Sequence, residues 1–488
     1  MSSKNNKIRL RLAPSPTGFL HIGNLRTALF GYLLVKNWKG KYLLRIEDTD
    51  QKREVAGATE KLINILKTMG LEFDEGPHVG GQYGPYIQSE RREIYNKFAS
   101  QLLNEEKIYR CFCSAERLTA MRTAQEANHE APRYDGLCRK LSLEESNRRA
   151  QAGDSFVLRQ KMPTAGEIIV RDELRGDIKF QLADLDDQVL IKSNGIPTYQ
   201  FANVIDDHLM EISYVTRGDE WLPSYPKNIL LYQAFDWVPP KFIHFPLILN
   251  KTGGGKLSKR QGDVFVEDYL AKGYLPEALI NFCVLLGWHP KNDQEIWSLE
   301  ELKSKFALDG LGASPAVFDL EKLDYFNGYY IRQKSPAELA NLSRPWLQAA
   351  GQDIQNEQQL QNFVGLAQDR LKKLSDIVEL TNFLFELPSY DPEILRWKTL
   401  TLKESLIKLQ EVKGEVEKIK EKDWTKENLE KSILTWLKKN NYKNGDYLWP
   451  LRVALTGLKN SPGPFEVAWA LGKAETLNRL NGINFTKN

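Results

Sequence analysis

The chain has 488 residues, of which 42% are hydrophobic and 27% are charged. This length and composition are typical of a globular protein with several domains, each large enough to bury its own core. The net charge of +3 is too small to indicate nucleic-acid binding by itself, so basic side chains would have to cluster locally. The chain has only 4 cysteines and no apolar core in residues 1–7. It also has no apolar run near the about 20 residues that cross a bilayer. Together these features favour a cytoplasmic protein without a disulfide framework.

A strand, a turn and the start of a helix are predicted near the N-terminus. Residues 8–12 alternate between apolar and basic side chains, which is the period of a strand, and the prolines and glycine of residues 14–18 end it. Apolar residues at helical spacing from Leu25 to Leu33 predict the helix. Residues 21–24 then lie at its first turn, where unpaired backbone N–H groups favour phosphate. His21 is therefore a candidate phosphate ligand, and a surface histidine that caps the turn is the alternative.

A second strand is predicted over residues 42–46, and it ends at Glu47. It completes a βαβ unit with the first strand and the helix. Open parallel sheets bind ligands at the carboxyl ends of their strands. We therefore expect Glu47 and His21 to lie at one edge of the sheet.

Two lysines far along the chain follow a run of glycines. Lys256 and Lys259 come after residues 253–255, in a loop that could close over a triphosphate and neutralise charge in a transition state. A solvated basic loop is the alternative. The loop is not a P-loop, because Leu257 stands where that motif needs serine or threonine, and Asn250 stands where it needs its first glycine.

Further motifs occur over nearly the whole chain in a fixed order. They cover residues 11–18, 45–50, 198–203, 204–210, 217–221, 256–260, 451–457 and 461–466. In this order they resemble the class I aminoacyl-tRNA synthetases and, within them, the bacterial-type glutamyl-tRNA synthetases. Asn24 replaces a second histidine of the general class pattern, and Leu257 and Arg260 replace methionine and serine, as is usual in the glutamyl branch. The resemblance implies an α/β fold with a Rossmann-type parallel-sheet catalytic domain, an inserted acceptor-binding domain and an all-helical C-terminal half.

Charge counting supports a pocket for glutamate. Two carboxylates and one ammonium group need about two cations and one anion in a buried site, and Arg11, Arg217 and Glu47 fit that count. A neutral amide would leave Arg217 unpaired, which opposes glutamine. Each arginine taken alone could instead form a surface ion pair. The resemblance implies a glutamate site made of Arg11, Ala13, Ser15, Glu47, Tyr199, Asn203 and Arg217.

The resemblance also implies an ATP site and two steps of chemistry. The α-carboxylate of glutamate attacks the α-phosphorus of ATP, and the terminal ribose of tRNA then attacks the adenylate. Mg²⁺ would neutralise the leaving pyrophosphate. His21, Lys256 and Lys259 are the expected catalytic residues, although Ile248 and Leu249 of the ATP site could equally be sheet core. The implied ATP site comprises His21, Gly23, Glu220, Trp221, Ile248, Leu249, Lys256 and Lys259.

Three of the cysteines are close in sequence. Cys111, Cys113 and Cys138 could hold a structural Zn²⁺ with a fourth ligand, and Tyr134 or His129 is the nearby candidate. The resemblance favours Tyr134, because related zinc-containing synthetases carry the same spacing. Reduced cysteines without a metal are the alternative. Cys283, in an apolar run, is predicted to be an inert core residue.

The order of the motifs predicts the domain limits. The Rossmann fold covers residues 1–93 and 201–250, with the tRNA acceptor-binding insertion and its zinc site at 94–200. A mobile loop and a stem-contact helical domain follow at 251–330, and two helical anticodon-binding domains at 331–390 and 391–488. Basic residues between Arg110 and Arg159 are a candidate tRNA surface, with a solvated helix face as the alternative.

The expected substrates are ATP, L-glutamate and tRNA(Glu), with tRNA(Gln) as a further substrate of a non-discriminating enzyme, and the expected state is a monomer without membrane contact. Glutaminyl-tRNA synthetase is the nearest rival, and Arg217, Asn24 and the helical C-terminal half disfavour it. A small nucleotidyltransferase would not need so long a C-terminal extension. A non-enzymatic RNA-binding relative would not need His21, Lys256 and Lys259.

Overall fold

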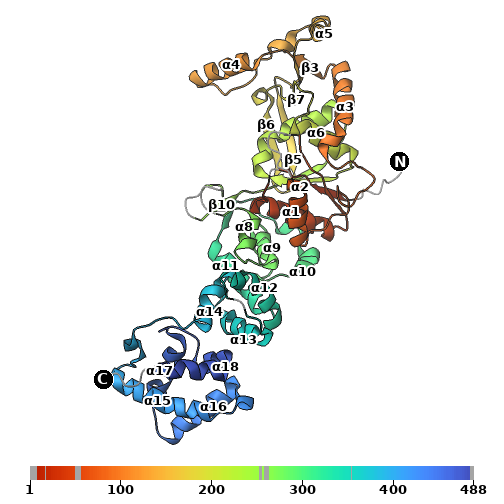
Figure 1. Cartoon of the computed structure of the whole chain (residues 1–488). Helices are drawn as coiled ribbons and strands as arrows, with labels where there is room; N and C mark the ends of the chain where they lie inside the picture. Colours follow the sequence, from red (N-terminus) through yellow and green to blue (C-terminus); the bar gives the residue numbers. More distant parts are fainter. Residues whose placement is uncertain are drawn as a thin grey trace. The chain divides into compact units, whose positions relative to one another are not determined.

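The computed structural model describes residues 8–16, 18–49, 57–251, 255–257, 263–352 and 354–483 (Figure 1). The chain forms two compact units. The first comprises Met1–Tyr269 and Leu279–Leu320, and the second comprises Leu270–Ala278 and Glu321–Asn488. Of the predicted site residues, Lys259 lies outside the described ranges.

A six-stranded sheet forms the centre of the first unit, with the strand order β2-β1-β8-β9-β5-β6. Strands β2, β1, β8, β9 and β5 are parallel to their neighbours, and β6 pairs antiparallel with β5. The strands are β1 (Arg9–Leu12), β2 (Lys41–Leu44), β5 (Glu167–Asp172), β6 (Gly176–Gln181), β8 (Tyr214–Gly218) and β9 (Lys241–Phe245). This parallel sheet confirms the predicted Rossmann-type α/β fold.

Helix α1 (Ile22–Asn37) connects β1 to β2 and is buried along almost its whole length. It packs closely on the sheet at Gly31, where a Cβ atom would lie 2.9 Å from the Tyr42 hydroxyl and 3.1 Å from Thr216 Oγ1. Glycine at this position therefore allows the helix to approach β2 and β8. The close approach fixes the N-terminus of α1 at the carboxyl edge of the sheet.

A second, three-stranded antiparallel sheet lies within the predicted insertion. It has the order β3-β4-β7, with β3 (Ile108–Cys111), β4 (Val157–Gln160) and β7 (Val189–Ile191). The helices α3 (Arg92–Asn104), α4 (Ala115–Ala127) and α5 (Leu143–Gln151) belong to the same part of the chain. Helix α4 has no buried residue.

The predicted limits of this insertion need a correction. Residues 94–200 were expected outside the catalytic fold, but β5 and β6 extend the catalytic sheet through the pairing of Asp172 with Phe242 of β9. The side chains of β6 alternate between exposed and half-buried positions, a pattern that any edge hairpin shows. The alternation in β6 therefore does not indicate which sheet the hairpin joins.

The remaining elements belong to the first unit, except that α8 and α9 each share residues of Leu270–Ala278 with the second unit. Helices α6 and α7 pack on each other, and β10 pairs with β11 in a separate two-stranded parallel sheet. These elements are α2 (Ala58–Thr68), α6 (Tyr199–Leu209), α7 (Tyr225–Ala234), β10 (Ile248–Asn250), α8 (Val266–Ala271), α9 (Pro276–Leu285), α10 (Leu299–Lys305) and β11 (Ala316–Phe318).

The second unit contains only helices among its described residues, which confirms the predicted helical C-terminal half. One apolar cluster extends through it from Leu275 to Leu480, so the two domains predicted at 331–390 and 391–488 share a continuous core. The longer of its two segments begins at Glu321, and the predicted limit was at 330. Its helices are α11 (Leu320–Arg332), α12 (Pro336–Ala349), α13 (Glu357–Ala367), α14 (Ile377–Phe385), α15 (Leu402–Lys418), α16 (Lys426–Lys439), α17 (Asn444–Thr456) and α18 (Pro464–Asn481). Within the described part of the chain, no helix has the length and apolar character that a membrane span requires.

Candidate active site

The candidate site lies at the carboxyl edge of the six-stranded sheet. Glu47 follows β2, Arg217 lies near the end of β8, and His244 lies near the end of β9. The chain passes from β1 to β2 on one side and places β8 on the other side of β1. Ligands of open parallel sheets bind where the strand order reverses in this way. The predicted placement of Glu47 beside the start of α1 follows from the parallel pairing of β1 with β2.

Two of the buried arginines at this edge share one carboxylate. Arg11 donates to both oxygens of Asp207 at 3.0 and 3.2 Å, and Arg45 Nη1 donates to Asp207 Oδ1 at 2.7 Å. Burial would raise the pKa of Asp207, but Arg11 and Arg45 hold it below its ordinary value. Asp207 therefore stays ionised between the two arginines. Arg11 has further, longer contacts at 3.5 Å, from Nη1 to Thr216 O and from Nη2 to Asn203 Oδ1.

Glu47 has one bonded and one unbonded carboxylate oxygen. Its Oε1 accepts from Arg45 Nη2 and from Asn203 Nδ2, both at 2.9 Å. Its Oε2 is buried and has no hydrogen-bond partner among the described residues. Burial raises the pKa of Glu47, while Arg45 and Arg11 oppose that shift. An incoming cationic group would satisfy the remaining oxygen.

Arg217 is the least satisfied charge of the site. It is 4% exposed, and its Nε donates to His244 Nε2 at 2.9 Å. Within the described ranges, neither of its buried terminal nitrogens forms a hydrogen bond of good geometry, although the Tyr199 hydroxyl is near enough to act on the guanidinium. Burial lowers the pKa of Arg217. Tyr199 raises this pKa, and the positive charge of Arg11 lowers it further. The two terminal nitrogens of the planar guanidinium can therefore donate to a planar acceptor such as a carboxylate.

Tyr199 connects these charges to the rim of the site. Its ring stacks on Trp221 with the centroids 4.5 Å apart. Burial raises the pKa of Tyr199, Glu47 raises it further, and Arg217 and Arg11 lower it. The phenol is therefore close to both the unsatisfied anion and the unsatisfied cation. Ala13 and Ser15 follow β1 at the same edge, and Ser15 is exposed.

His21 is the N-cap residue of α1. Its Nδ1 accepts a hydrogen bond from Gly23 N at 3.0 Å, so the neutral ring carries its proton on Nε2. A Cβ atom on Gly23 would lie 3.2 Å from His21 Nδ1 and 3.9 Å from Ile248 Cδ1. The histidine thus caps the turn, as the alternative interpretation of the sequence proposed. Its Nε2–H also lies beside the helix N-terminus, where anions bind.

The predicted nucleotide residues come together around β10. Arg26 of α1 donates to the main-chain oxygens of Pro246 and Leu286, which holds the segment before β10 against the helix. Ile248 is buried and Leu249 is half-buried. Lys256 Nζ lies 3.7 Å from Glu220 Oε1, and both side chains are largely exposed. The structure therefore places Lys256 and Glu220 together, whereas Lys259 lies outside the described residues.

Four functional candidates were missed by sequence reasoning. Arg45 and Asp207 lie inside two of the recognised motifs, so charge within those motifs was a usable signal. Asp172 and His244 lie outside every motif, and only the pairing of β5 with β9 brings them together. No local pattern in the sequence indicates that contact.

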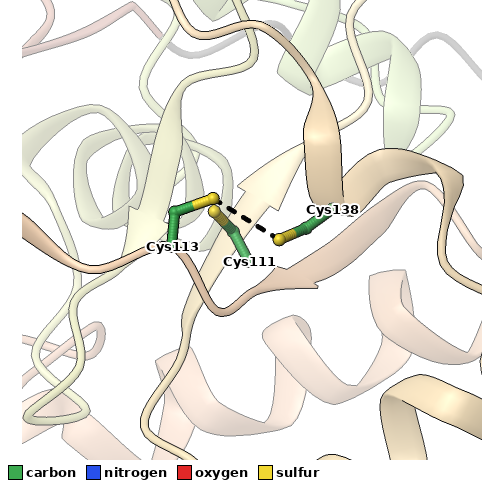
Figure 2. A group of neighbouring side chains, drawn as sticks. All are labelled: Cys111, Cys113 and Cys138. Atoms are coloured by element: carbon green, nitrogen blue, oxygen red, sulfur yellow. Dashed lines mark hydrogen bonds between the residues drawn. The ribbon is translucent and has the colours of Figure 1, made fainter. Parts of the chain in front are cut away.

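The three clustered cysteines point toward one another (Figure 2). Their sulfur atoms all lie within 4.8 Å of one another, and Cys113 Sγ lies 3.6 Å from Cys138 Sγ. The Tyr134 hydroxyl lies 3.3 Å from Cys111 Sγ and 3.6 Å from Cys113 Sγ. These separations match those of four ligands in a tetrahedron with metal–sulfur bonds of about 2.3 Å. His129 is not a member of the sulfur group.

The surroundings of the cluster are basic and ordered. Arg117 Nη1 donates to Cys113 Sγ at 3.4 Å, and Arg159 lies 4.1 Å from the centroid of the Tyr134 ring. Burial raises the pKa of Tyr134, so the phenol is neutral unless a cation binds it. Cys283 is fully buried, and burial raises its pKa to about 12, as an inert core thiol requires.

Comparison with known proteins identifies the class. Residues 7–325 match the catalytic domain of the class I tRNA synthetases (E and Q), and residues 338–483 match an anticodon binding domain. The chain belongs to this family, and the resemblance inferred from the motifs is confirmed.

The particular relatives within the class are also clear. The glutamate–tRNA ligases of Clostridium botulinum (strain Hall) and Clostridium tetani are each 45% identical to this chain, over 99% of both chains. A crystal structure of a glutamate tRNA ligase from Elizabethkingia meningosepticum, in complex with its amino acid, is 36% identical. It superimposes with a TM-score of 0.89 and covers 97% of this chain and 98% of that one.

Proposed function

We propose that this chain is a glutamate–tRNA ligase, which activates L-glutamate with ATP and transfers it to the terminal adenosine of tRNA. The observation that carries the proposal is the pair of unsatisfied charges in one buried pocket. Arg217 offers two free N–H directions and Glu47 offers one free oxygen. An amino acid with an acidic side chain supplies both missing partners, and glutamine would leave the fork of Arg217 without a charged acceptor.

In this proposal each of the three charged groups of glutamate has its own partner in the pocket. Arg217 binds the γ-carboxylate with its terminal nitrogens, and Glu47 receives the ammonium group with Oε2. Arg11 addresses the α-carboxylate with the N–H capacity that Asp207 leaves. Tyr199 and Asn203 shape the wall between these charges, and the residues after β1, Ala13 and Ser15, complete the rim.

ATP would bind at the N-terminus of α1. The N–H groups there and His21 Nε2–H meet its phosphates, Gly23 leaves room for the nucleotide, and Ile248 and Leu249 line the adenine. Trp221, stacked on Tyr199, separates the nucleotide from the amino acid. Glu220 holds Lys256 at the edge of this site. Synthetases of this class use ATP with Mg²⁺, which when bound neutralises the pyrophosphate.

The protein needs no nucleophile of its own. It holds the α-carboxylate of glutamate in line with the α-phosphorus, which is catalysis by position and charge. His21, Lys256 and Lys259 stabilise negative charge on the phosphates as the bond to pyrophosphate breaks. The ribose hydroxyl of tRNA then attacks the carbonyl of the adenylate and releases AMP.

The cysteine cluster suits a structural zinc ion. Cys111, Cys113 and Cys138 would supply three thiolates and Tyr134 the fourth ligand, with no open position for catalysis. The spacing of the four side chains supports this assignment. Elemental analysis of purified protein tests it, with Cys138→Ser as the comparison. We expect about one zinc per chain and its loss in the variant, and wild-type protein without zinc contradicts the assignment.

The rest of the chain would bind tRNA. We propose that the insertion with the small sheet, within residues 94–200, contacts the acceptor end and that the stem-contact region lies within 251–330. The helices of 331–390 and 391–488 would contact the anticodon. The enzyme would act as a monomer in the cytoplasm, where tRNA is charged for translation. Aminoacylation of purified tRNA(Glu) and tRNA(Gln) decides whether it is discriminating.

Pyrophosphate exchange tests the function directly. With tRNA(Glu) present we expect exchange that depends on L-glutamate and not on L-glutamine, and nearly silent exchange without tRNA. Exchange driven equally by glutamine contradicts the substrate assignment. Lys259→Ala should lower the rate of adenylate formation far more than it weakens ATP binding, and an unchanged rate contradicts its assigned role.

A further inference from the structure

The orientation of Arg217 depends on two residues outside the recognised motifs. Arg217 Nε donates to His244 Nε2 at 2.9 Å, and His244 Nδ1 lies 2.8 Å from Asp172 Oδ2. All three side chains are buried, with His244 at 0% and Asp172 at 1% exposure. They form a single line of hydrogen bonds beneath the pocket.

The chemistry of the groups fixes the proton in this line. An arginine Nε only donates, so His244 Nε2 must accept and the ring proton must be on Nδ1. That proton then points at Asp172 Oδ2. Burial lowers the pKa of His244, and Arg217 lowers it further, against the opposing effect of Asp172. The imidazole is therefore neutral near pH 7.

Asp172 is held so that it can fix the imidazole. Its Oδ1 accepts from the backbone nitrogens of Leu174 and Arg175, both at 3.0 Å. Its Oδ2 also accepts from the backbone nitrogen of His244 at 3.0 Å. The carboxylate therefore cannot rotate toward Arg217 without losing several bonds.

We propose that Asp172 and His244 are positioning residues that aim Arg217 at the γ-carboxylate of the substrate while leaving its charge unneutralised. This inference rests on the proposed function. Arg11 and Arg45 contact Asp207 directly, whereas a neutral ring separates Arg217 from Asp172. A carboxylate in direct contact would compete with the substrate for the guanidinium. An imidazole spacer orients the fork and keeps the anion a ring's width away, where its attraction is weaker.

The other neighbours of Arg217 and His244 fit the same role. The Arg217 guanidinium carbon lies 5.0 Å from the Phe242 ring centroid and 5.8 Å from that of Tyr225. Tyr225 also packs against His244 at 4.9 Å. The charged groups that act on His244 are Asp172, Arg217 and Arg175, and Arg175 is itself paired with Asp219. In the described structure, Asp172 is thus the only anion among the groups that act on the ring.

Two isosteric substitutions separate the two hydrogen bonds of His244. The amide oxygen of a glutamine can reach the position of Nε2 and accept from Arg217, whereas the amide of an asparagine reaches only the position of Nδ1 and Asp172. We expect His244→Asn to raise the KM for glutamate about ten- to hundredfold, the effect of losing a hydrogen bond to a charged group. His244→Gln should keep most of the affinity. The KM for ATP should stay unchanged in both variants.

Asp172→Asn tests the proton position. With its NH2 group at the Oδ2 position, the asparagine would face the His244 Nδ1–H, and the imidazole would have to move its proton to Nε2, opposite Arg217 Nε–H. With the NH2 group at the Oδ1 position, it would face the backbone N–H groups of Leu174 and Arg175 and lose their hold on the side chain. We expect a raised KM for glutamate here as well. His289→Gln, at an exposed histidine outside the site, is the matched control and should leave both KM values unchanged.

The outcomes separate this proposal from the proposed function. If wild-type protein shows no glutamate-dependent pyrophosphate exchange, the proposed function is wrong, and so is the positioning role of Asp172 and His244 that rests on it. If wild-type protein is active but His244→Asn and His244→Gln have the same KM for glutamate, only the positioning role of Asp172 and His244 is wrong. Thermal unfolding of both variants is measured alongside, because a merely structural role would lower stability in both and leave the two KM values alike.

Discussion

Arg217 in the first unit and Arg479 in the second are equally buried, each 4% exposed, but their hydrogen bonds differ completely. Arg479 in α18 donates to the main-chain oxygens of Phe383, Leu384 and Leu455, and its Nε donates to Glu475. Every nitrogen of its guanidinium has a partner. Among the described residues, Arg217 has a hydrogen bond of good geometry at Nε only, and its two terminal nitrogens have none, with the Tyr199 hydroxyl nearby.

The difference separates a structural cation from a binding cation. Burying a charge is costly unless its hydrogen bonds are complete. Arg479 meets that condition by tying α14, α17 and α18 together. Arg217 fails to meet it in the free protein, so its burial is tolerated only because the rest of the fold supplies the stability. A substrate carboxylate then gains the interaction that folding leaves unmade, and this difference can be tested at both arginines.

The largest expected effect is at Arg217. Arg217→Gln should raise the KM for glutamate roughly a thousandfold, because loss of one partner of a buried charge pair costs about 2–5 kcal/mol. Its thermal stability should be unchanged or higher, because the variant no longer buries an unsatisfied charge. Pyrophosphate exchange and thermal unfolding measure the two effects. A large fall in melting temperature with little change in KM would make Arg217 a structural residue like Arg479.

The opposite result is expected at Arg479. Arg479→Met should lower the free energy of unfolding by about 3 kcal/mol, because it leaves buried carbonyl oxygens without a donor. The KM for glutamate should stay unchanged in the folded protein. Urea unfolding and exchange kinetics below the transition check both statements, and a changed KM at full stability would contradict them.

Much of the fold could be predicted because it depends on local patterns. The apolar spacing from Leu25 to Leu33 and the turn before it placed α1 and the capping position of His21 correctly. The strand before Glu47 was likewise predicted from the local sequence of residues 42–46. Sheet membership was not, because β5 joins β9 through a pairing between residues that are far apart in sequence. The continuous core of the second unit was missed for the same reason.

Several residues of the candidate site could be predicted from the sequence, whereas the contacts between them could not. Arg11, Glu47 and Arg217 could be proposed from their charges and motifs. Which of these residues have a partner in the folded protein could not be predicted, because Asp207 pairs with Arg11 and not with Arg217 only through tertiary contacts. His244 looks like any other strand residue in the sequence.

A smaller effect is expected from pH through His244. Its pKa in the folded protein lies below the ordinary 6.5, so between these two values the unfolded chain binds a proton that the folded chain does not. Stability should therefore fall as pH drops below about 6.5, by at most about 1.4 kcal/mol per pH unit for this one group. His244→Gln should remove that part of the slope.

Urea unfolding of wild type and His244→Gln between about pH 7.5 and about pH 5.5 measures the difference. His78 and His208 also have lowered pKa values, but they are common to both proteins and cancel. Identical slopes would mean that His244 is not held neutral beside Arg217.

The smallest effect is expected at an arginine that is paired but exposed. Arg148 on α5 donates to both oxygens of Glu145 at 2.8 Å, and its side chain is 71% exposed. Water competes for both partners, so Arg148→Ala should leave the free energy of unfolding almost unchanged. If α5 contacts the acceptor end of tRNA, the same variant should weaken tRNA binding and reduce its salt dependence. A filter-binding assay over a range of salt concentrations measures this, with unfolding in urea as the control. A stability loss as large as that of Arg479→Met would show that the paired hydrogen bonds, and not burial, make an arginine structural.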